Sequence, residues 1–277
     1  MKTVRLPSGE KVSAVGLGTW HIGDDRARRA EEIATVRLAL DLGAALIDTA
    51  EMYGDGRAEE LVGEVIAGRR DEVFLVSKVL PQNATRRGAV AACERSLRRL
   101  GTDRLDLYLL HWRGAAPLAE TLEAFAALQR AGKIRHFGVS NLDVEDMQEL
   151  WSMAGGSEIV TDQVLYNLSR RGIEWELLPW LRERAIPIMA YSPIEQGRLL
   201  DNRGLIGFAR RHGMTPAQAA LAWLLSKQDV IVIPKTGSRA RLREDLDALN
   251  HELTASQLAE LDGIFPPPAG PASLEML

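Results

Sequence analysis

Short apolar runs recur along the chain, and longer stretches between them repeat apolar positions every three or four residues. A short apolar run between turn residues is typical of a buried strand, whereas the longer period is typical of an amphipathic helix. The runs with strand character are Ala14–Gly18, Ala45–Asp48, Val73–Ser77, Leu105–Leu110, Ile134–Val139, Ile159–Gln163, Ile186–Tyr191 and Val230–Ile233. A β-hairpin over residues 4–13, with its turn at Pro7-Ser8-Gly9-Glu10, precedes them.

Helical patterns fill the segments between the strand-like runs. Several end at a glycine, which favours the left-handed residue that follows many helices. The last helix begins at Thr254 with a capping-box pattern, Thr254-Ala255-Ser256-Gln257. The other expected helices are Ala30–Leu42, Arg86–Leu100, Ala116–Ala131, Val144–Met153, Ile173–Arg184, Leu205–His212 and Pro216–Lys227.

Eight strands that alternate with helices predict an α/β fold, a (β/α)8 TIM barrel with an N-terminal β-hairpin and extra C-terminal helices. No linker or low-complexity tract divides the chain, so we expect one domain over residues 1–277. An open doubly wound sheet is the alternative. It is less favoured because Gly16-Leu17-Gly18-Thr19-Trp20 lacks the third glycine of a dinucleotide-binding turn.

The composition restricts the class of function. A net charge of −4 gives no basic excess for nucleic acid or an anionic membrane surface. The single cysteine, Cys93, lies in a helical pattern and excludes an intramolecular disulfide. Because we find no signal-peptide core and no apolar stretch long enough to span a bilayer, we expect a cytoplasmic protein.

Polar residues stand at or just beyond the carboxyl ends of three successive strand-like runs: Asp48 and Tyr53, then Lys78, then His111. The spacings are 30 residues (78 − 48) and 33 residues (111 − 78), about the length of one strand, one helix and two loops. The side chains should therefore converge at one end of a parallel sheet, where α/β enzymes carry their chemistry.

Several motifs together resemble those of the aldo-keto reductases, over nearly the whole chain. They are GLGTW at 16–20, IDTAEMYG at 47–54, SK at 77–78, LHW at 110–112, GVSN at 138–141 and IPKT at 233–236. The resemblance implies a barrel that binds NADPH without a Rossmann fold and reduces aldehydes and ketones to alcohols. By overall pattern the chain is most similar to bacterial members that act on small aldehydes and 2-oxoaldehydes such as methylglyoxal.

The four polar residues match the family's catalytic tetrad, and their chemistry suits carbonyl reduction. Tyr53 would donate the proton, and a cationic Lys78 beside its hydroxyl would lower the pKa of the phenol. Asp48 would hold Lys78, because a buried ammonium without a partner is costly. His111 would donate a hydrogen bond to the carbonyl oxygen.

The resemblance also implies a set of cofactor contacts. Ser140, Asn141 and Gln163 would hold the nicotinamide carboxamide, and Tyr191 would stack on its ring. Lys235, Thr236 and Arg241 would clamp the 2′-phosphate. The full cofactor set is Gly18, Thr19, Asp48, Ser140, Asn141, Gln163, Tyr191, Ser192, Lys235, Thr236, Arg241 and Asp245.

One position departs from the family pattern. Asp245 stands where many members have an asparagine that contacts the adenine edge. An ionised carboxylate accepts hydrogen bonds but does not donate them. The sequence therefore does not decide whether Asp245 contacts the adenine, or how far this position contributes to the preference for NADPH over NADH.

Trp20, His111 and Trp112 are the expected substrate contacts. Short loops after His111 and Tyr191, and a short tail after Ile264, suggest an open pocket with broad specificity. The other tryptophans lie in helical patterns and are expected to pack in the core: Trp151, Trp175, Trp180 and Trp223.

Two other functions remain as alternatives. A metal-dependent hydrolase would need several histidine and carboxylate ligands, and only His111 of the five histidines stands clearly at a strand end. We therefore expect no metal. A nicotinamide-nucleotide-sensing module with little turnover would use the same fold. The expected partner is a small carbonyl compound, and the expected assembly is a monomer or a weak homo-oligomer.

Overall fold

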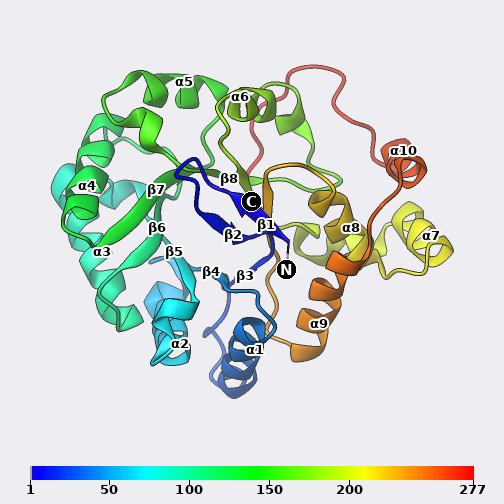
Figure 1. The fold of residues 1–277 in the computed structure, drawn as a ribbon, viewed down its shortest axis with the longest axis horizontal. Helices are drawn as coiled ribbons and strands as arrows, with labels where there is room; N and C mark the ends of the chain where they lie inside the picture. The colour runs from blue at the N-terminus through cyan, green and yellow to red at the C-terminus, as the bar shows by residue number, and fades with distance from the viewer. Residues whose placement is uncertain (1) are drawn as a thin grey trace.

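A parallel sheet that closes on itself forms the centre of the computed structural model, which describes residues 2–277 (Figure 1). The order of the strands within this range is β10-β9-β8-β7-β6-β5-β4-β3. Main-chain hydrogen bonds from Val232 to Ala14 and from Gly18 to Pro234, both 2.8 Å, join the last strand to the first. The strands are β3 (Gly16–Gly18), β4 (Leu46–Asp48), β5 (Phe74–Val79), β6 (Leu105–Leu110), β7 (Ile134–Ser140), β8 (Asp162–Leu165), β9 (Ile188–Tyr191) and β10 (Val230–Ile233).

This closure confirms the predicted barrel and rules out the open doubly wound sheet. The strands are short and buried on both faces, since helices cover the outside and side chains fill the inside. All six residues of β6, for example, are buried.

The helices surround the barrel (Figure 1). Most lie where the periodicity predicts them, within a few residues at each end. They are α1 (Arg29–Asp41), α2 (Arg57–Ile66), α3 (Arg86–Leu100), α4 (Leu118–Arg130), α5 (Val144–Ser152), α6 (Leu177–Glu183), α7 (Arg203–Arg211), α8 (Pro216–Leu225), α9 (Arg239–Asp247) and α10 (Ala255–Ile264).

The sequence prediction omitted α2 and α9. Helix α2 has a clear apolar stripe, with Leu61, Val62 and Val65 buried, so the sequence pattern was sufficient to predict it. The second buries only Leu242 and Asp245 within its bounds. A helix that is polar nearly all round gives little periodic signal, because few of its positions face the core.

The hairpin of β1 (Thr3–Arg5) and β2 (Lys11–Ser13) lies across the barrel opening (Figure 1). Its Val4 and Val12 are buried in the core. Glu10, in the turn, accepts hydrogen bonds from Arg135 at 2.9 Å and pairs with His136 at 2.7 Å, both at the start of β7. The hairpin therefore closes the amino-terminal end and leaves the carboxyl ends of the strands open.

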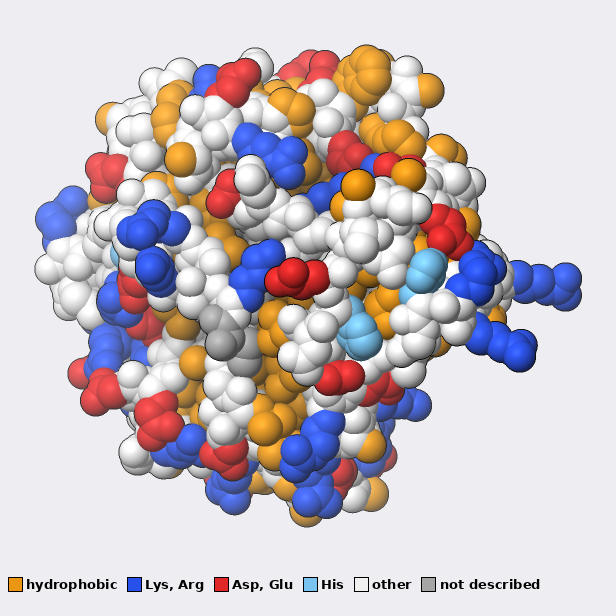
Figure 2. All heavy atoms as spheres, turned by 45° about the vertical axis from the view of Figure 1, so that its right-hand side comes forward, with side chains coloured by type: hydrophobic (Ala, Val, Ile, Leu, Met, Phe, Trp, Pro, Cys, Tyr) orange, Lys and Arg blue, Asp and Glu red, His pale blue; other side chains and the backbone are white. Residues whose placement is uncertain are grey.

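Expectations for the core residues are largely met. Cys93 and Trp223 are fully buried, and Trp180 is nearly so. Trp175 is 46% exposed, so the prediction that it packs in the core was wrong. It follows a short helical turn (Gly172–Glu174) rather than lying inside a helix. Acidic and basic side chains are mixed over the face seen in Figure 2.

Candidate active site

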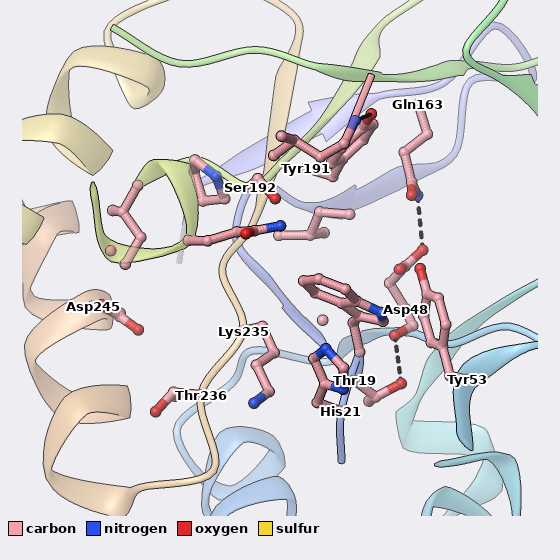
Figure 3. Close-up of a pocket in the computed structure, with 18 of the residues that line it drawn as sticks. Thr19, His21, Asp48, Tyr53, Gln163, Tyr191, Ser192, Lys235, Thr236 and Asp245 are labelled. Carbon is pink, nitrogen blue, oxygen red and sulfur yellow. Dashed lines mark hydrogen bonds between the residues drawn. The ribbon is translucent and has the colours of Figure 1, made fainter. Parts of the chain in front are cut away.

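The predicted tetrad comes together at the carboxyl ends of the strands (Figure 3). Lys78 Nζ lies 2.7 Å from Asp48 Oδ2 and 3.2 Å from the Tyr53 hydroxyl. It also donates to the Thr49 carbonyl at 2.9 Å. One ammonium therefore connects the carboxylate and the phenol.

The turn after β4 places Tyr53 over the barrel mouth. Gly54, Asp55 and Gly56 all have positive φ, at 57°, 55° and 94°. Two glycines at these positions reduce the cost of the left-handed turn, since they carry no Cβ. The chain can thus reverse directly after Tyr53 and leave its ring half-buried beside His111, at 5.8 Å between ring centroids.

The protonation of Tyr53 differs from the sequence-based expectation. Burial, and then the negative charge of Asp48, raise the pKa of Tyr53 well above its ordinary value. Lys78 does not reverse this shift, because its charge is balanced by the nearer Asp48, and burial lowers the pKa of Lys78 itself. The pKa of Tyr53 is therefore raised, whereas the sequence led us to expect that Lys78 would lower it, and Tyr53 holds its proton at neutral pH.

His111 is a neutral imidazole. Burial first, and then the positive charge of Lys78, lower its pKa to about 2. Its Nδ1 atom is buried and has no hydrogen-bond partner among the described residues. A neutral ring keeps one N–H, so His111 retains a donor for an oxygen atom in the cavity.

A second group of polar side chains borders the tetrad. Gln163 donates to the other Asp48 oxygen at 2.7 Å (dashed in Figure 3). The Ser140 hydroxyl donates to the Gln163 carbonyl at 2.7 Å, and Asn141 donates to Ser140 at 3.0 Å. The Tyr191 hydroxyl donates to Asn141 Oδ1 at 3.0 Å. The predicted carboxamide-binding residues therefore form one network with Asp48.

These groups line a cavity of about 900 Å³ that extends to α9. Figure 3 shows Asp48 and Tyr53 at one end and Thr236 and Asp245 at the other. Lys78 is the one predicted site residue that does not line the cavity, because it lies buried beneath Tyr53. The predicted residues that do line it are Gly18, Thr19, Trp20, Asp48, Tyr53, His111, Trp112, Ser140, Asn141, Gln163, Tyr191, Ser192, Lys235, Thr236, Arg241 and Asp245.

The end of the cavity near α9 is rich in charge. Burial, and then the positive charges of Arg28 and Arg241, lower the pKa of the half-buried Lys235. Burial first, and then Glu244, raise the pKa of Asp245 to about 7, while Arg241 opposes this shift. The Asp245 carboxyl is therefore partly protonated at neutral pH.

Other parts of the cavity wall were missed by the sequence analysis. Gln196 and Gly197 come from the turn after β9, where both have positive φ. Met276 and Leu277 come from the tail, and Leu277 N–H donates to the Tyr191 hydroxyl at 3.4 Å. The tail is short, as predicted, but it reaches back to the site, which its sequence does not reveal because the segment has no periodic pattern.

Comparisons with known proteins agree with this geometry. Residues 14–265 match the Aldo/keto reductase family. The chain is 48% identical to the methylglyoxal reductase YeaE of Escherichia coli, over 100% of this chain and 99% of that protein. It is 35% identical to the glyoxal reductase of Bacillus subtilis, over 95% of this chain and 92% of that protein.

A solved structure with the same architecture is an aldo/keto reductase from Klebsiella pneumoniae in complex with NADP and acetate. Its TM-score to this structure is 0.97, at 49% identity, over 100% of this chain and 99% of that chain. A second structure, of an aldo-keto reductase from the same organism with NADPH, gives the same values. The chain belongs to the aldo/keto reductase family.

Family membership also sets aside the metal-dependent hydrolase. Over residues 2–277, no three histidine, cysteine, aspartate or glutamate side chains gather in a way that could hold a metal ion. No helix in the same range is long and apolar enough to cross a membrane.

Proposed function

We propose that this protein reduces small aldehydes and 2-oxoaldehydes to alcohols with NADPH. The observation that carries the proposal is the Lys78 ammonium, which joins Asp48 and the Tyr53 hydroxyl beneath a cavity of about 900 Å³. The names of its relatives support the substrate class, since one is a methylglyoxal reductase and another a glyoxal reductase.

The two ends of the cavity fit a phosphorylated dinucleotide. Amide and hydroxyl groups of Ser140, Asn141 and Gln163 at one end would hold the carboxamide, and Tyr191 would lie against the ring. Lys235, Thr236 and Arg241 at the other end would hold the 2′-phosphate. When bound, NADPH supplies the hydride that no side chain supplies.

Tyr53 is the proton donor. Its raised pKa keeps the phenol protonated until the carbonyl oxygen gains negative charge. As the proton leaves, the phenolate stays 3.2 Å from the Lys78 ammonium, which stabilises the new negative charge. Asp48 keeps Lys78 charged and in place within this buried site.

His111 orients the carbonyl group. Because its pKa of about 2 leaves the ring neutral, it adds no positive charge that would compete with Tyr53 as an acid. Its N–H would donate to the carbonyl oxygen and so help to fix the angle of the reacting bond.

The apolar mouth of the cavity sets the class of substrate. Trp20 and Met52 stand about 40% and 39% exposed at this mouth, and Trp112 lines it. We infer that small aldehydes, 2-oxoaldehydes and flat aromatic aldehydes enter there with few specific polar contacts. A strict preference for one bulky substrate in a substrate panel would contradict this broad specificity.

The test is NADPH oxidation with methylglyoxal and several aromatic aldehydes, with NADH in parallel. Turnover that favours NADPH supports both the tetrad and the phosphate site. Equal turnover with NADH would support the reductase activity but contradict the proposed 2′-phosphate site. Tight NADPH binding without turnover would favour the sensing module instead.

Three further properties stay predictions. We infer that residues 1–277 act as a single domain, in the cytoplasm, as a monomer or a weak homo-oligomer. Light scattering at several protein concentrations would measure the assembly.

A further inference from the structure

The arginine that immediately precedes α1 lies beside the loop that follows β10. Arg28 Nη2 is 3.1 Å from the position that a Cβ atom would occupy at Gly237. The two residues are 209 positions apart (237 − 28). They meet because α1 packs against α9, as Figure 1 also shows.

Gly237 makes room for this arginine. It does not have positive φ, so the backbone there does not require glycine. A Cβ atom would instead approach Arg28 Nη2 and Glu32 Cγ, each at 3.1 Å, which is closer than side chains normally pack. The missing side chain therefore lets the guanidinium lie against the loop that carries Lys235 and Thr236.

Among the described residues, three cations near this loop form no salt bridge, although neighbouring arginines do. The nearby pairs are Arg29 with Glu64 at 2.6 Å, Arg57 with Asp24 at 3.3 Å and Arg239 with Glu31 at 3.0 Å. Within residues 2–277, Arg28, Lys235 and Arg241 form no such salt bridge. Glu32, the acidic residue nearest to Gly237, accepts instead from the Gly23 N–H at 2.9 Å.

The positive charges act on one another. After burial, Arg28 is the largest influence that lowers the pKa of Lys235, and it precedes Arg241. Glu32 and Asp24 oppose this shift, so the positive charges are only partly offset, and a bound phosphate would relieve the repulsion that remains. The cluster therefore favours an anionic ligand.

We propose that Arg28 forms the second wall of the 2′-phosphate site and helps this enzyme to select NADPH over NADH. The inference rests on the proposed cofactor and deepens it. Lys235, Thr236 and Arg241 would hold the phosphate from the side of β10 and α9, and Arg28 would reach it from the residue just before α1. Its planar guanidinium donates in a fork that matches phosphate oxygens.

The test measures binding of 2′,5′-ADP and 5′-AMP by calorimetry, because only the first carries the 2′-phosphate. In Arg28→Gln, binding of 2′,5′-ADP should weaken about tenfold or more, and binding of 5′-AMP should change less than about twofold. The ratio of kcat/KM for NADPH to that for NADH should fall by a similar factor. Arg28→Lys should keep part of the preference, since it retains the charge and loses the fork.

Arg37→Gln is the matched control. It removes the same charge from the same helix at an exposed position, about 13 Å further along α1 (nine residues, 37 − 28). If Arg37→Gln weakens 2′,5′-ADP as much as Arg28→Gln does, the effect is net charge and the proposal fails. Equal weakening of 5′-AMP and 2′,5′-ADP by Arg28→Gln, or no weakening of either, would also overturn it.

The binding assay separates this inference from the proposed function. If the wild type reduces no carbonyl compound, but Arg28→Gln selectively weakens binding of 2′,5′-ADP, the proposed function fails and the role of Arg28 at the 2′-phosphate site stands. If the wild type and Arg28→Gln prefer NADPH equally, the proposed function stands and the role of Arg28 at the 2′-phosphate site fails.

Discussion

Both carboxylate oxygens of Asp48 are engaged, one by Lys78 and the other by Gln163, each at 2.7 Å. Its backbone carbonyl also accepts from the Thr19 hydroxyl at 2.9 Å. Asp48 therefore links the proton donor to the predicted carboxamide site. A shift of Asp48 would therefore disturb both the Lys78–Tyr53 pair and the predicted carboxamide site, because both depend on its carboxylate.

At Tyr53 we predict a loss of chemistry without a loss of fold. Tyr53→Phe keeps the ring that packs edge-on to His111 but removes the hydroxyl, which carries the only acidic proton of the side chain. The kcat for aldehyde reduction should fall by about 10²–10⁴, the usual contribution of a general acid. NADPH binding, followed by fluorescence, should stay within about twofold, and near-normal turnover would defeat the mechanism.

At Lys78 we predict a loss of stability as well as activity. Lys78→Met leaves Asp48 buried without its cation, which typically costs about 3–5 kcal/mol. Urea unfolding should show the loss. The double variant Asp48→Asn with Lys78→Met should recover part of the stability and none of the activity; if it is no more stable than Lys78→Met alone, the pairing argument is wrong.

At Asp245 we predict a pH dependence. Its pKa in the folded protein is raised from 3.8 to about 7, so the wild type loses stability relative to Asp245→Asn as pH rises through that window. The melting temperatures should be similar near pH 4 and should separate by pH 8, with Asp245→Asn the higher.

The same group should affect cofactor binding. A protonated carboxyl both donates and accepts, as an asparagine amide does at an adenine edge, whereas the carboxylate only accepts. NADPH affinity of the wild type should therefore fall between pH 6 and pH 8 more than that of Asp245→Asn. Parallel affinity profiles for the two proteins would mean that Asp245 does not contact the adenine.

For individual residues, the sequence predicted which side chains come together better than it predicted their protonation. Asp48, Lys78 and His111 were placed correctly because the carboxyl ends of parallel strands meet at one edge. The direction of the Tyr53 pKa was not, since burial raises it first and the charge of Asp48 raises it further. How deeply one ring is buried at a barrel mouth has no pattern in a sequence.

At the scale of elements, the strands and amphipathic helices were predictable, and α9 was not. It is positioned by its contacts with α1 and α8 rather than by an apolar stripe of its own. Arg28 was overlooked for a related reason. It lies in a basic run, Arg26–Arg29, that has the pattern of solvated surface until α1 and α9 are seen to pack together.

Two helices with the same capping box provide a test at this scale. Thr215 caps α8, in which nine residues are buried, and Thr254 caps α10, in which only Leu261 is buried within the helix bounds. Thr215→Ala should lower the free energy of unfolding by about 1 kcal/mol. Thr254→Ala should lower it less, because an exposed helix end can fray without unfolding the barrel; equal losses in urea unfolding would contradict this difference.

At the scale of the whole molecule, the tail connects distant loops around the site. Glu275 pairs with Arg170, whose guanidinium also donates to the buried Glu195 at 2.9 Å in the turn after β9. Asn167 donates to the same Glu195 at 2.7 Å. Loops after β8 and β9 and the tail are thus held by one set of charges, and Met276 and Leu277 complete the cavity wall.

Removal of Glu275–Leu277 should widen the site without unfolding the protein. These residues are exposed, and they add no strand or helix to the barrel, so the melting temperature should hardly change. Because Leu277 lies against Tyr191, its loss should raise kcat/KM for bulky aromatic aldehydes more than for methylglyoxal. Glu275→Gln, which keeps every residue and loses only the charge, should give a smaller shift in the same direction. If the truncated enzyme loses activity on both substrates equally, the tail supports the cofactor site rather than selecting the substrate.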